Sequence, residues 1–324
     1  AKAVRQVPAI GLPRTLGLLY FAWAGPALAR REGAELTLSF ARAVGADILR
    51  SGGGAHVSYV RAARQWRGSL AADAMWIAPY HRAQMAIERC GFSSPSLRKV
   101  IAVSDLVRDD LVRRFNIAGA KAVTLYNGVD LERFAPQRDE NIRQRIRRGL
   151  GLDAATPMVA FVGNGFARKG LRFLLAAWPK LKSSTALAVV GSDRASASYE
   201  RLARRLGIGG RVSFLGRQAR AEDFFHACDV VALPSLFEPF GNVVMEAMAS
   251  GVPALTSARC GVAEILPAAM RPFVVDNPCD SEEIAAKLDA LIESRFEVAG
   301  AARPRAEEFT WERYARGLLD ILGL

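Results

Sequence analysis

Cysteine is scarce in this 324-residue sequence, and the four cysteines, Cys90, Cys228, Cys260 and Cys279, lie far apart without a CxxC pair. That spacing predicts a reducing compartment and argues against a structural zinc site. A secretion signal is also lacking, so we expect a cytoplasmic protein. The apolar run Leu16–Ala29 is too short to cross a bilayer and predicts a buried or interfacial helix.

Acidic residues are few in the first half of the sequence. Residues 1–150 contain 24 Lys and Arg against 12 Asp and Glu, whereas residues 151–324 contain 20 of each kind. A one-sided basic region predicts an anionic partner: lipid headgroups, a phosphorylated glycan or nucleic acid. The basic faces show little aromatic interleaving, which argues against nucleic acid. Compositional drift in an arginine-rich proteome is the alternative, but drift alone should affect both halves.

Arginine recurs at every third position, at Arg61, Arg64 and Arg67, with Trp66 among the arginines. This period predicts one basic helical face. Such a face is most often only solvated. Together with the charge asymmetry, it favours contact with an anionic acceptor or with a membrane surface.

The length of the chain suffices for two domains. The charged segment 141–148, followed by two glycines, predicts a boundary near residue 150. Beyond it, apolar runs such as MVAFV at 158–162 alternate with helical segments, which predicts an α/β domain with a parallel doubly wound sheet. We therefore expect domains at 1–150 and 151–306, and a C-terminal helix at 307–324 as a candidate to cross back to the first domain. Ligands bind such sheets at the carboxyl ends of strands, so the residues that follow strands should share one rim: Gly163, Gly191, Gly216, Ser235 and Glu238.

The segment EPFGNVVMEAMASGVP, residues 238–253, holds two carboxylates, Glu238 and Glu246. Pro239 favours an extended backbone at Glu238, and the apolar spacing from Asn242 predicts a short helix that contains Glu246. The amides of residues 240–243 should point out of the helix start, where the helix dipole suits a phosphate. Carboxylates accept hydrogen bonds from sugar hydroxyls, so the segment predicts a sugar-nucleotide site. A capped core helix with two solvated glutamates is the alternative.

The loop GNGFARKG, residues 163–170, places Arg168 and Lys169 at or just before a helix predicted to begin at Leu171. Cations are unfavourable there because the helix dipole is positive, and a bound diphosphate would reverse the sign of that interaction. A solvated basic loop is the alternative, but it leaves the glycine content unexplained.

A second glycine-rich loop, SGGGAH at 51–56, lies in the first half. Successive glycines let backbone come close to a ligand. His56 at the end of the loop is therefore a candidate ligand contact, and an ordinary turn histidine is an equally open alternative.

Several segments together resemble the retaining family 4 glycosyltransferases, whose GT-B fold has two facing Rossmann-like domains. EPFGNVVMEAMASGVP is similar to the E-x7-E motif of that family, and FVGNGFARKG is similar to its phosphate-binding loop. The segments VSDLVRDDLVRRF with YNGVDLERF, and VSFLGRQARAEDFFHACDVVALPS, agree in order and spacing, so the resemblance covers residues 100–260. Within the family, the SGGGAH loop is most similar to the lipopolysaccharide-core glucosyltransferases.

The resemblance implies transfer of a hexose, glucose in that subgroup, from a UDP-sugar to an anionic lipid-linked or lipopolysaccharide-core glycan, with retention of configuration. Arg168 and Lys169 would bind the donor diphosphate and stabilise the leaving group. Glu246 would hold the ribose hydroxyls, and Glu238 would hold sugar hydroxyls or lie near the reacting carbon. His56 would contact the donor sugar from the opposite side. The remaining donor contacts implied are Gly163, Gly191, Leu215, Phe240, Gly241, Asn242 and Val243.

The resemblance implies neither a prosthetic group nor a metal, and no DxD motif is present in the sequence. It also implies peripheral contact with the cytosolic face of an inner membrane. A GT-B epimerase or hydrolase, which shares the fold and lacks the acceptor, is one alternative. An inactive fragment that binds a membrane is another.

The start of the chain departs from the family pattern. The first domain of the family opens with a strand and a glycine-rich loop that reaches the donor phosphate, and residues 1–15 have neither. We therefore expect the sequence to begin partway into that domain, with one or two strands missing from its sheet. Asn164 also stands where the family often has a small residue, which is expected to change how the loop meets phosphate.

Overall fold

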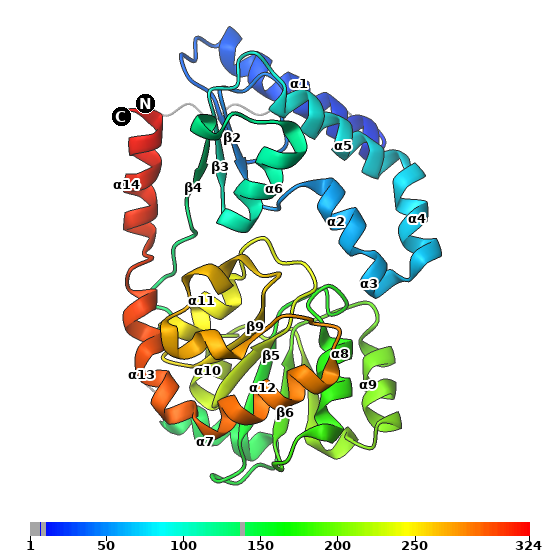
Figure 1. Ribbon diagram of the computed structural model, residues 1–324, viewed down its shortest axis with the longest axis vertical. Helices are drawn as coiled ribbons and strands as arrows, with labels where there is room; N and C mark the ends of the chain where they lie inside the picture. Colours follow the sequence, from blue (N-terminus) through cyan, green and yellow to red (C-terminus); the bar gives the residue numbers. More distant parts are fainter. Residues whose placement is uncertain (1–6, 8–10, 137–139) are drawn as a thin grey trace. The chain divides into compact units, whose positions relative to one another are not determined.

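The chain divides into two compact units, Ala1–Tyr126 and Asn127–Leu324 (Figure 1). The structure is a computed structural model, and it describes residue 7 and residues 11–136 and 140–324. Each unit contains a parallel β-sheet with helices, so the α/β fold class predicted from the alternating pattern is confirmed.

The first unit contains a four-stranded sheet in the order β1-β2-β3-β4, and all its strands are parallel. The strands are β1 (Leu38–Ser39), β2 (Ile48–Ser51), β3 (Lys99–Ala102) and β4 (Ala122–Thr124). The helices are α1 (Arg14–Arg31), α2 (His56–Ala62), α3 (Arg64–Arg67), α4 (Ser69–Ile77), α5 (Pro79–Phe92) and α6 (Asp105–Phe115). Strand β3 is followed by Ser104, the N-cap of α6, whose hydroxyl accepts a hydrogen bond from the Val107 amide.

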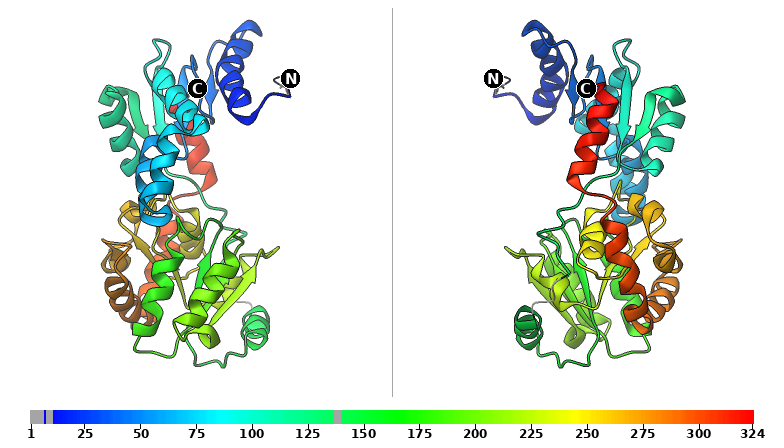
Figure 2. Two further views of the ribbon diagram at one scale, coloured as in Figure 1. Left: turned by 90° about the vertical axis from the view of Figure 1, so that its right-hand side faces the viewer. Right: turned by 90° about the vertical axis from the view of Figure 1, so that its left-hand side faces the viewer.

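The second unit contains a six-stranded parallel sheet in the order β10-β9-β8-β5-β6-β7. The strands are β5 (Met158–Val162), β6 (Ala186–Val190), β7 (Val212–Gly216), β8 (Val230–Leu233), β9 (Ala254–Ser257) and β10 (Val274–Val275). The helices are α7 (Glu140–Gly149), α8 (Leu171–Ala177), α9 (Ser196–Arg205), α10 (Asp223–Ala227), α11 (Asn242–Ala249), α12 (Ser281–Glu293), α13 (Arg295–Ala306) and α14 (Trp311–Leu322). Helices cover both faces of this sheet (Figure 2).

The core of the second unit is built on strands that are buried along their whole length. Every residue of β5, β6, β8 and β9 is buried. Burial on both faces explains the continuous apolar runs of the sequence, because helices pack on each side of a parallel sheet. From β5 the chain adds β6 and β7 on one side of the sheet, and then places β8, β9 and β10 on the other. The direction of winding therefore reverses at β5, and the crevice at such a reversal is where doubly wound sheets bind ligands.

The helix α7 belongs to the second unit, so the boundary expected near residue 150 lies inside that unit. Arg143 Nη2 donates to Asp229 Oδ1 at 2.9 Å, and Arg147 forms an ion pair with the same carboxylate. The arginines of the charged segment 141–148 thus fasten α7 onto the body of the second unit. The predicted return of the C-terminal helix to the first domain stays a prediction.

The basic helical face expected in the first unit needs correction. The arginines at 61, 64 and 67 do not share one helix, because α2 ends at Ala62 and α3 begins at Arg64. Arg64 forms an ion pair with Asp73 of α4.

The apolar run near the start is α1, a largely half-buried helix in which Ala22 and Pro26 are buried. Within the described ranges, no helix has the length and apolar character that crossing a membrane requires.

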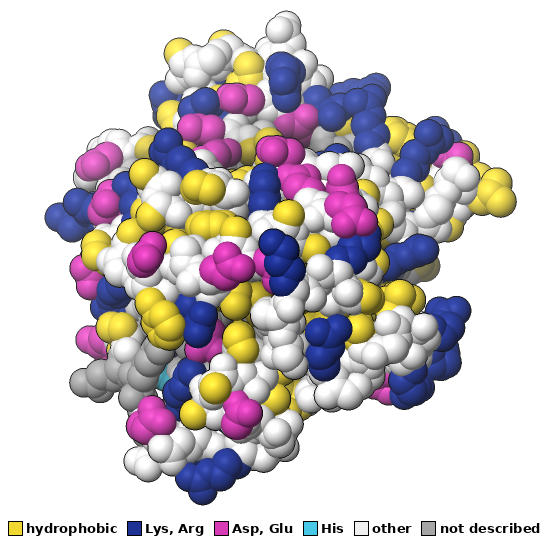
Figure 3. Space-filling view, turned by 60° about the horizontal axis from the view of Figure 1, so that its bottom comes forward, with side chains coloured by type: hydrophobic (Ala, Val, Ile, Leu, Met, Phe, Trp, Pro, Cys, Tyr) yellow, Lys and Arg dark blue, Asp and Glu magenta, His cyan; other side chains and the backbone are white. Residues whose placement is uncertain are grey.

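The charge asymmetry follows the two units. Residues 1–126 contain 18 Lys and Arg against 8 Asp and Glu, and residues 127–324 contain 26 against 24. Basic and acidic side chains are interspersed over most of the face drawn in Figure 3. The excess positive charge of the chain therefore belongs mainly to the first unit.

Candidate active site

Glu238, Arg168 and Lys169 form one cluster in the second unit. Arg168 Nη1 donates to Glu238 Oε2 at 2.8 Å, and Lys169 Nζ donates to the same oxygen at 2.9 Å. Arg168 Nη1 also donates to the carbonyl of Phe237 at 2.7 Å. The two cations come from the loop after β5 and the carboxylate comes from the segment after β8, so the cluster spans the strand pair at which the winding reverses.

The ionisation of Glu238 follows from its neighbours. Burial alone would raise the pKa of this carboxyl, and Lys169 and Arg168 more than offset it, so the pKa is held below its usual value. Lys169 itself is only 7 % exposed. Two full positive charges share one carboxylate, which leaves a local surplus of positive charge. This arrangement can accept a further anion without removing Glu238.

The glycines at the ends of β5 and β6 allow this packing. Gly163 has φ +136° and Gly191 has φ +133°, conformations that residues with a Cβ rarely adopt. A Cβ on Gly163 would lie 2.7 Å from Lys169 Cε, and one on Gly191 would lie 2.1 Å from the Gly163 carbonyl oxygen. Asn164 accepts the Ser192 amide through Oδ1 at 2.8 Å, so its side chain joins the two loops.

The helix α11 begins at Asn242, as the sequence predicts, after Gly241 with φ +110°. A Cβ on Gly241 would lie 2.5 Å from Cys260 Sγ, so only glycine fits at this turn. Across residues 11–136 and 140–324, no backbone partner accepts the amides of Asn242 and Val243. The Asn242 side chain accepts a hydrogen bond from Asn127 Nδ2 at 2.9 Å. The first turn of α11 thus presents two amides that a phosphate could use.

Glu246 differs from Glu238, since no described cation is in contact with its carboxylate. Its pKa is raised above the usual value by burial, which outweighs the charges of Arg133 and Lys169. Within the part of the chain that the structure describes, no hydrogen bond or ion pair engages the Glu246 side chain. A carboxylate that is held by the helix and lacks a partner is suited to accept hydroxyl hydrogens from a ligand.

Leu215 lies one residue before the end of β7, and its carbonyl accepts a hydrogen bond from Gln218 Nε2 at 2.6 Å. The Gly191 amide donates to the Gly216 carbonyl at 2.8 Å, so the loops after β6 and β7 lie side by side. Phe240 is buried, and its carbonyl accepts the Val262 amide at 2.7 Å. Backbone carbonyls of Leu215 and Phe240 are thus held by hydrogen bonds from neighbouring segments.

His56 lies in the first unit, as the first residue of α2, and it is buried. Its backbone amide donates to both carboxylate oxygens of Glu88, at 3.0 and 2.8 Å. Its ring Nε2 lies 2.8 Å from His81 Nδ1, and the two rings are stacked. Burial, together with the charges of Arg42 and His81, lowers the pKa of His56 to about 4. His56 is therefore a neutral imidazole near pH 7.

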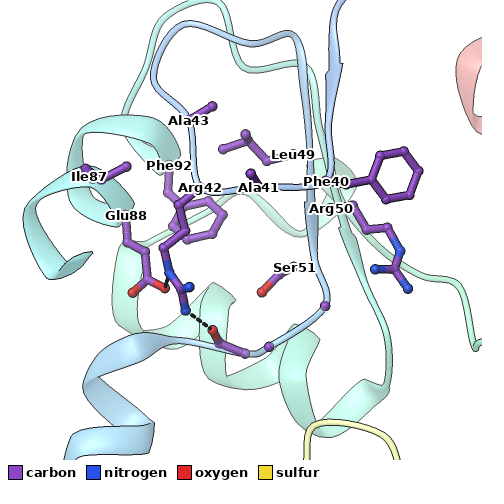
Figure 4. A pocket seen from close by; sticks show the side chains of 13 residues that line it. Phe40, Ala41, Arg42, Ala43, Leu49, Arg50, Ser51, Ile87, Glu88 and Phe92 are labelled. Atoms are coloured by element: carbon purple, nitrogen blue, oxygen red, sulfur yellow. Dashed lines mark hydrogen bonds and ion pairs between the residues drawn. The ribbon is translucent and has the colours of Figure 1, made fainter. Parts of the chain in front are cut away.

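The residues that hold His56 were missed from the sequence. Arg42 Nε donates to Glu88 Oε1 at 2.6 Å, and Arg42 Nη2 reaches the Gly54 carbonyl at 3.4 Å (Figure 4). Arg42 and Glu88 therefore fasten the SGGGAH loop to α5. No motif marks them, and the only available signal was an acidic residue inside an otherwise amphipathic helix.

The chain matches two protein-family descriptions. Residues 142–309 match "Glycosyl transferases group 1", and residues 2–133 match "Glycosyltransferase Family 4". Lipopolysaccharide glucosyltransferase WaaG of Escherichia coli is 27 % identical over 301 residues, which cover 91 % of this chain and 78 % of the relative.

Other curated relatives match over shorter stretches. An uncharacterized glycosyltransferase of Methanocaldococcus jannaschii is 28 % identical over 231 residues, 69 % of this chain and 59 % of the relative. D-inositol 3-phosphate glycosyltransferase of Rhodococcus opacus is 34 % identical over 245 residues, 69 % of this chain and 54 % of the relative. The matched stretches thus span between half and two thirds of the length of these two relatives.

Solved structures agree in fold. The crystal structure of WaaG, described as a glycosyltransferase involved in lipopolysaccharide biosynthesis, superposes with a TM-score of 0.80 at 24 % identity and covers 99 % of this chain and 86 % of its own. HepE of Anabaena in complex with UDP superposes with a TM-score of 0.70 at 19 % identity and covers 95 % of this chain and 76 % of its own. The match of the group 1 description to more than half of the chain settles the family: this protein is a group 1 glycosyl transferase with a GT-B fold.

Proposed function

We propose that this glycosyltransferase moves glucose from a UDP-sugar to an anionic, lipid-linked glycan of the lipopolysaccharide-core type, with retention of configuration. The observation that carries the proposal is the convergence of Arg168 Nη1 and Lys169 Nζ on Glu238 Oε2, at 2.8 and 2.9 Å. The surplus positive charge of this cluster matches a diphosphate. The UDP bound by HepE supports the choice of nucleotide, and the similarity to WaaG supports the choice of acceptor.

In the proposed step, an acceptor hydroxyl oxygen forms a bond to the anomeric carbon as the bond from that carbon to the β-phosphate oxygen breaks. Attack and departure take place on the same face, and the departing phosphate takes the hydroxyl proton. The products are a glycoside and UDP. Arg168 and Lys169 stabilise the negative charge that develops on the phosphate, and fixed charges of this kind are usually the largest catalytic contribution. The step requires no metal ion.

Three further groups bind the donor in this proposal. The amides of Asn242 and Val243 donate to phosphate and sugar oxygens, and Glu246 accepts from the ribose hydroxyls. Glu238 is held by the two cations and accepts from a sugar hydroxyl through its other oxygen, Oε1. The Gly163 and Gly191 loops pack closely enough for backbone to approach the nucleotide.

His56 contacts the donor sugar as a neutral hydrogen-bond partner. Its Nε2 is used by His81, so Nδ1 is the ring atom left for a hydroxyl. The basic first unit is the side of the protein that we assign to the anionic acceptor and to peripheral contact with the cytosolic face of an inner membrane.

The test is a transfer assay with UDP-glucose and a lipid-linked core acceptor that lacks its first glucose. We expect UDP release that depends on the acceptor, and a product whose anomeric configuration, read from its NMR coupling constant, equals that of the donor. Arg168→Ala should slow turnover by about a hundredfold and change acceptor binding little, because it removes a contact to the leaving group.

Other outcomes would replace the proposal. UDP release that is independent of acceptor would fit an epimerase or a hydrolase. Absence of turnover with retained binding to anionic vesicles would fit a membrane-binding fragment. An inverted product would contradict the retaining step.

A further inference from the structure

A cavity of about 790 Å³ in the first unit is lined by side chains from α2, α4, α5 and α6. Four arginines reach it, and the helices that carry them are separated in sequence: Arg61, Arg89, Arg113 and Arg114. Among the residues that the structure describes, two acidic ones, Glu88 and Asp110, line the same cavity. Helices that are far apart in the chain thus place positive charge around one space.

The two acidic residues do not neutralise that charge, because each already has partners. Glu88 accepts from Arg42 Nε and from the His56 amide. Asp110 accepts from Arg114 Nε at 2.7 Å and also bonds to Ser58. Of the four lining arginines, Arg114 is therefore the one whose charge is balanced inside the cavity by a described residue.

The other three arginines are Arg61, Arg89 and Arg113. In the described part of the chain, none of them forms an ion pair or donates a side-chain hydrogen bond. Each lies in the last turn of its helix, where the dipole offers about half a negative charge. Three full charges against three half charges leave the cavity positive. Interaction with helix ends therefore explains part of the arrangement and leaves room for an anion.

The wall of the cavity is not uniformly polar. Trp76, Met85 and Phe115 line it together with the arginines, and all of them are half-buried. An inorganic ion needs no such surface, whereas a sugar ring presents an apolar face that packs on an aromatic side chain. Guanidinium groups bind the oxygens of phosphate and carboxylate in the same planar manner. The lining therefore matches a sugar that carries an oxyanion.

We propose that this cavity binds an anionic saccharide, through its phosphate or carboxylate group, as the part of the acceptor that anchors it to the first unit. Glu88 lines the cavity and also accepts a hydrogen bond from the His56 amide. Val57, the residue after His56, lines the cavity as well. The role of the ligand as an acceptor rests on the proposed transfer function. The chemical class of the ligand rests on the residues that line the cavity. Binding of the saccharide needs no donor.

The first experiment measures binding calorimetrically with the full chain and without nucleotide. The probes are glucose 6-phosphate, glucuronate, inorganic phosphate and glucose. We expect glucose 6-phosphate and glucuronate to bind more tightly than glucose, with an affinity that falls as salt is added. Arg61→Ala and Arg113→Ala should each weaken this binding by about tenfold, which is the loss of one charge-assisted contact. Arg31→Ala removes an exposed arginine that does not line the cavity, and should leave binding unchanged.

The second experiment separates the sugar from the anion. Trp76→Leu should weaken binding of glucose 6-phosphate by several-fold and leave binding of inorganic phosphate unchanged. Thermal melts of each variant establish that it is folded, and Trp76→Phe should retain most of the affinity. Equal binding of glucose and glucose 6-phosphate would overturn the proposal, and so would an equal effect of Arg31→Ala. Arginine-dependent binding of phosphatidylglycerol vesicles without binding of the sugars would instead identify a membrane site.

In the transfer assay, Arg113→Ala should raise the KM for an anionic acceptor about tenfold and leave kcat unchanged. Transfer that is unaffected by the arginine variants would contradict this site and leave the proposed function standing. Arginine-dependent binding of the sugars in a protein without transfer activity would support the site and contradict the function.

Discussion

Two glutamates, the buried Glu88 in the first unit and the half-buried Glu238 in the second, show how the number of neighbouring cations decides what a carboxylate can do. Glu88 in the first unit is 4 % exposed and has one cation in contact, Arg42. Glu238 in the second unit has two, Arg168 and Lys169. Burial raises the pKa of Glu88 above its usual value despite Arg42, whereas the two cations hold the pKa of Glu238 below its usual value.

The two clusters differ in net charge, and we therefore expect them to have different roles. The Glu88 cluster is balanced, one carboxylate against one guanidinium, and its remaining hydrogen bonds go to the backbone of the SGGGAH loop (Figure 4). It is a structural fastening that orients His56. The Glu238 cluster keeps a surplus cation at the edge of the sheet where ligands bind. Of the two clusters, the second is the one whose surplus charge suits the polyanion of the proposed function.

Loss of the surplus cation should have the largest effect. Lys169→Met leaves Arg168 and Glu238 as a balanced pair, and we expect kcat to fall by about 10² to 10³-fold because charge on the leaving phosphate is no longer stabilised. Steady-state kinetics with UDP-glucose measures this. Lys180→Met removes a lysine whose ion pair with Glu282 lies at the surface, and serves as the matched control. A variant with the kcat of the wild type would show that the surplus charge has no catalytic role.

Removal of the shared carboxylate tests the comparison directly. Glu238→Gln leaves two cations close together and should destabilise the unliganded protein by about 3 kcal/mol, as does breaking other partly buried ion pairs. UDP should restore stability, so the shift of Tm by UDP should exceed that of the wild type. In Glu88→Gln the loss of stability should persist with UDP present. Equal rescue of both variants by UDP would remove the distinction between the clusters.

The pH dependence of stability should report His56. Because its pKa in the folded protein is about 4 and the ordinary value is 6.5, its contribution is complete above pH 6.5 and is lost as pH falls towards 4. The loss is at most about 3 kcal/mol, since one pKa unit corresponds to about 1.4 kcal/mol. Urea unfolding between pH 7.5 and 4.5 should therefore show a smaller decline for His56→Gln than for the wild type.

A control separates His56 from its neighbours. The raised pKa of Glu88 acts with the opposite sign, adding stability as pH falls, so the comparison of variants is more informative than the wild-type slope. His226→Gln changes a histidine of α10 and should keep the wild-type decline. Equal declines in all three proteins would mean that His56 takes up its proton without cost.

The sequence predicts well those features that depend on local pattern. Helix α11 begins at Asn242 as expected, because a glycine turn marks its start, and α14 (Trp311–Leu322) lies within the segment 307–324 that is expected to form the C-terminal helix. Strand β5 has the bounds of the apolar run MVAFV, residues 158–162, since that run is uninterrupted. The resemblance to a glycosyltransferase family, which rests on several segments in order, is confirmed.

Individual contacts between side chains far apart in the chain were not predicted. Arg168 and Lys169 both contact Glu238, which lies about 70 positions away in the sequence. Neither loop contains a pattern that predicts contact with the other loop. The same holds for Arg42 and Glu88, which no motif marks. The three-residue arginine period was misleading, because α2 ends at Ala62 and a separate helix, α3, begins at Arg64. The roles of the individual site residues stay predictions.

The smallest expected effect concerns Glu246, which lacks the cations that Glu238 has. Glu246→Gln should weaken UDP-sugar binding by about tenfold, the loss of a charge-assisted hydrogen bond to a hydroxyl, and leave kcat at saturating donor nearly unchanged. Because burial raises the pKa of Glu246, the carboxylate takes up a proton at a higher pH than an ordinary glutamate. Donor affinity should therefore weaken as the solution becomes mildly acidic, and this dependence should disappear in the variant. Titration calorimetry at several pH values measures both effects, and an unchanged affinity at neutral pH would remove Glu246 from the donor site.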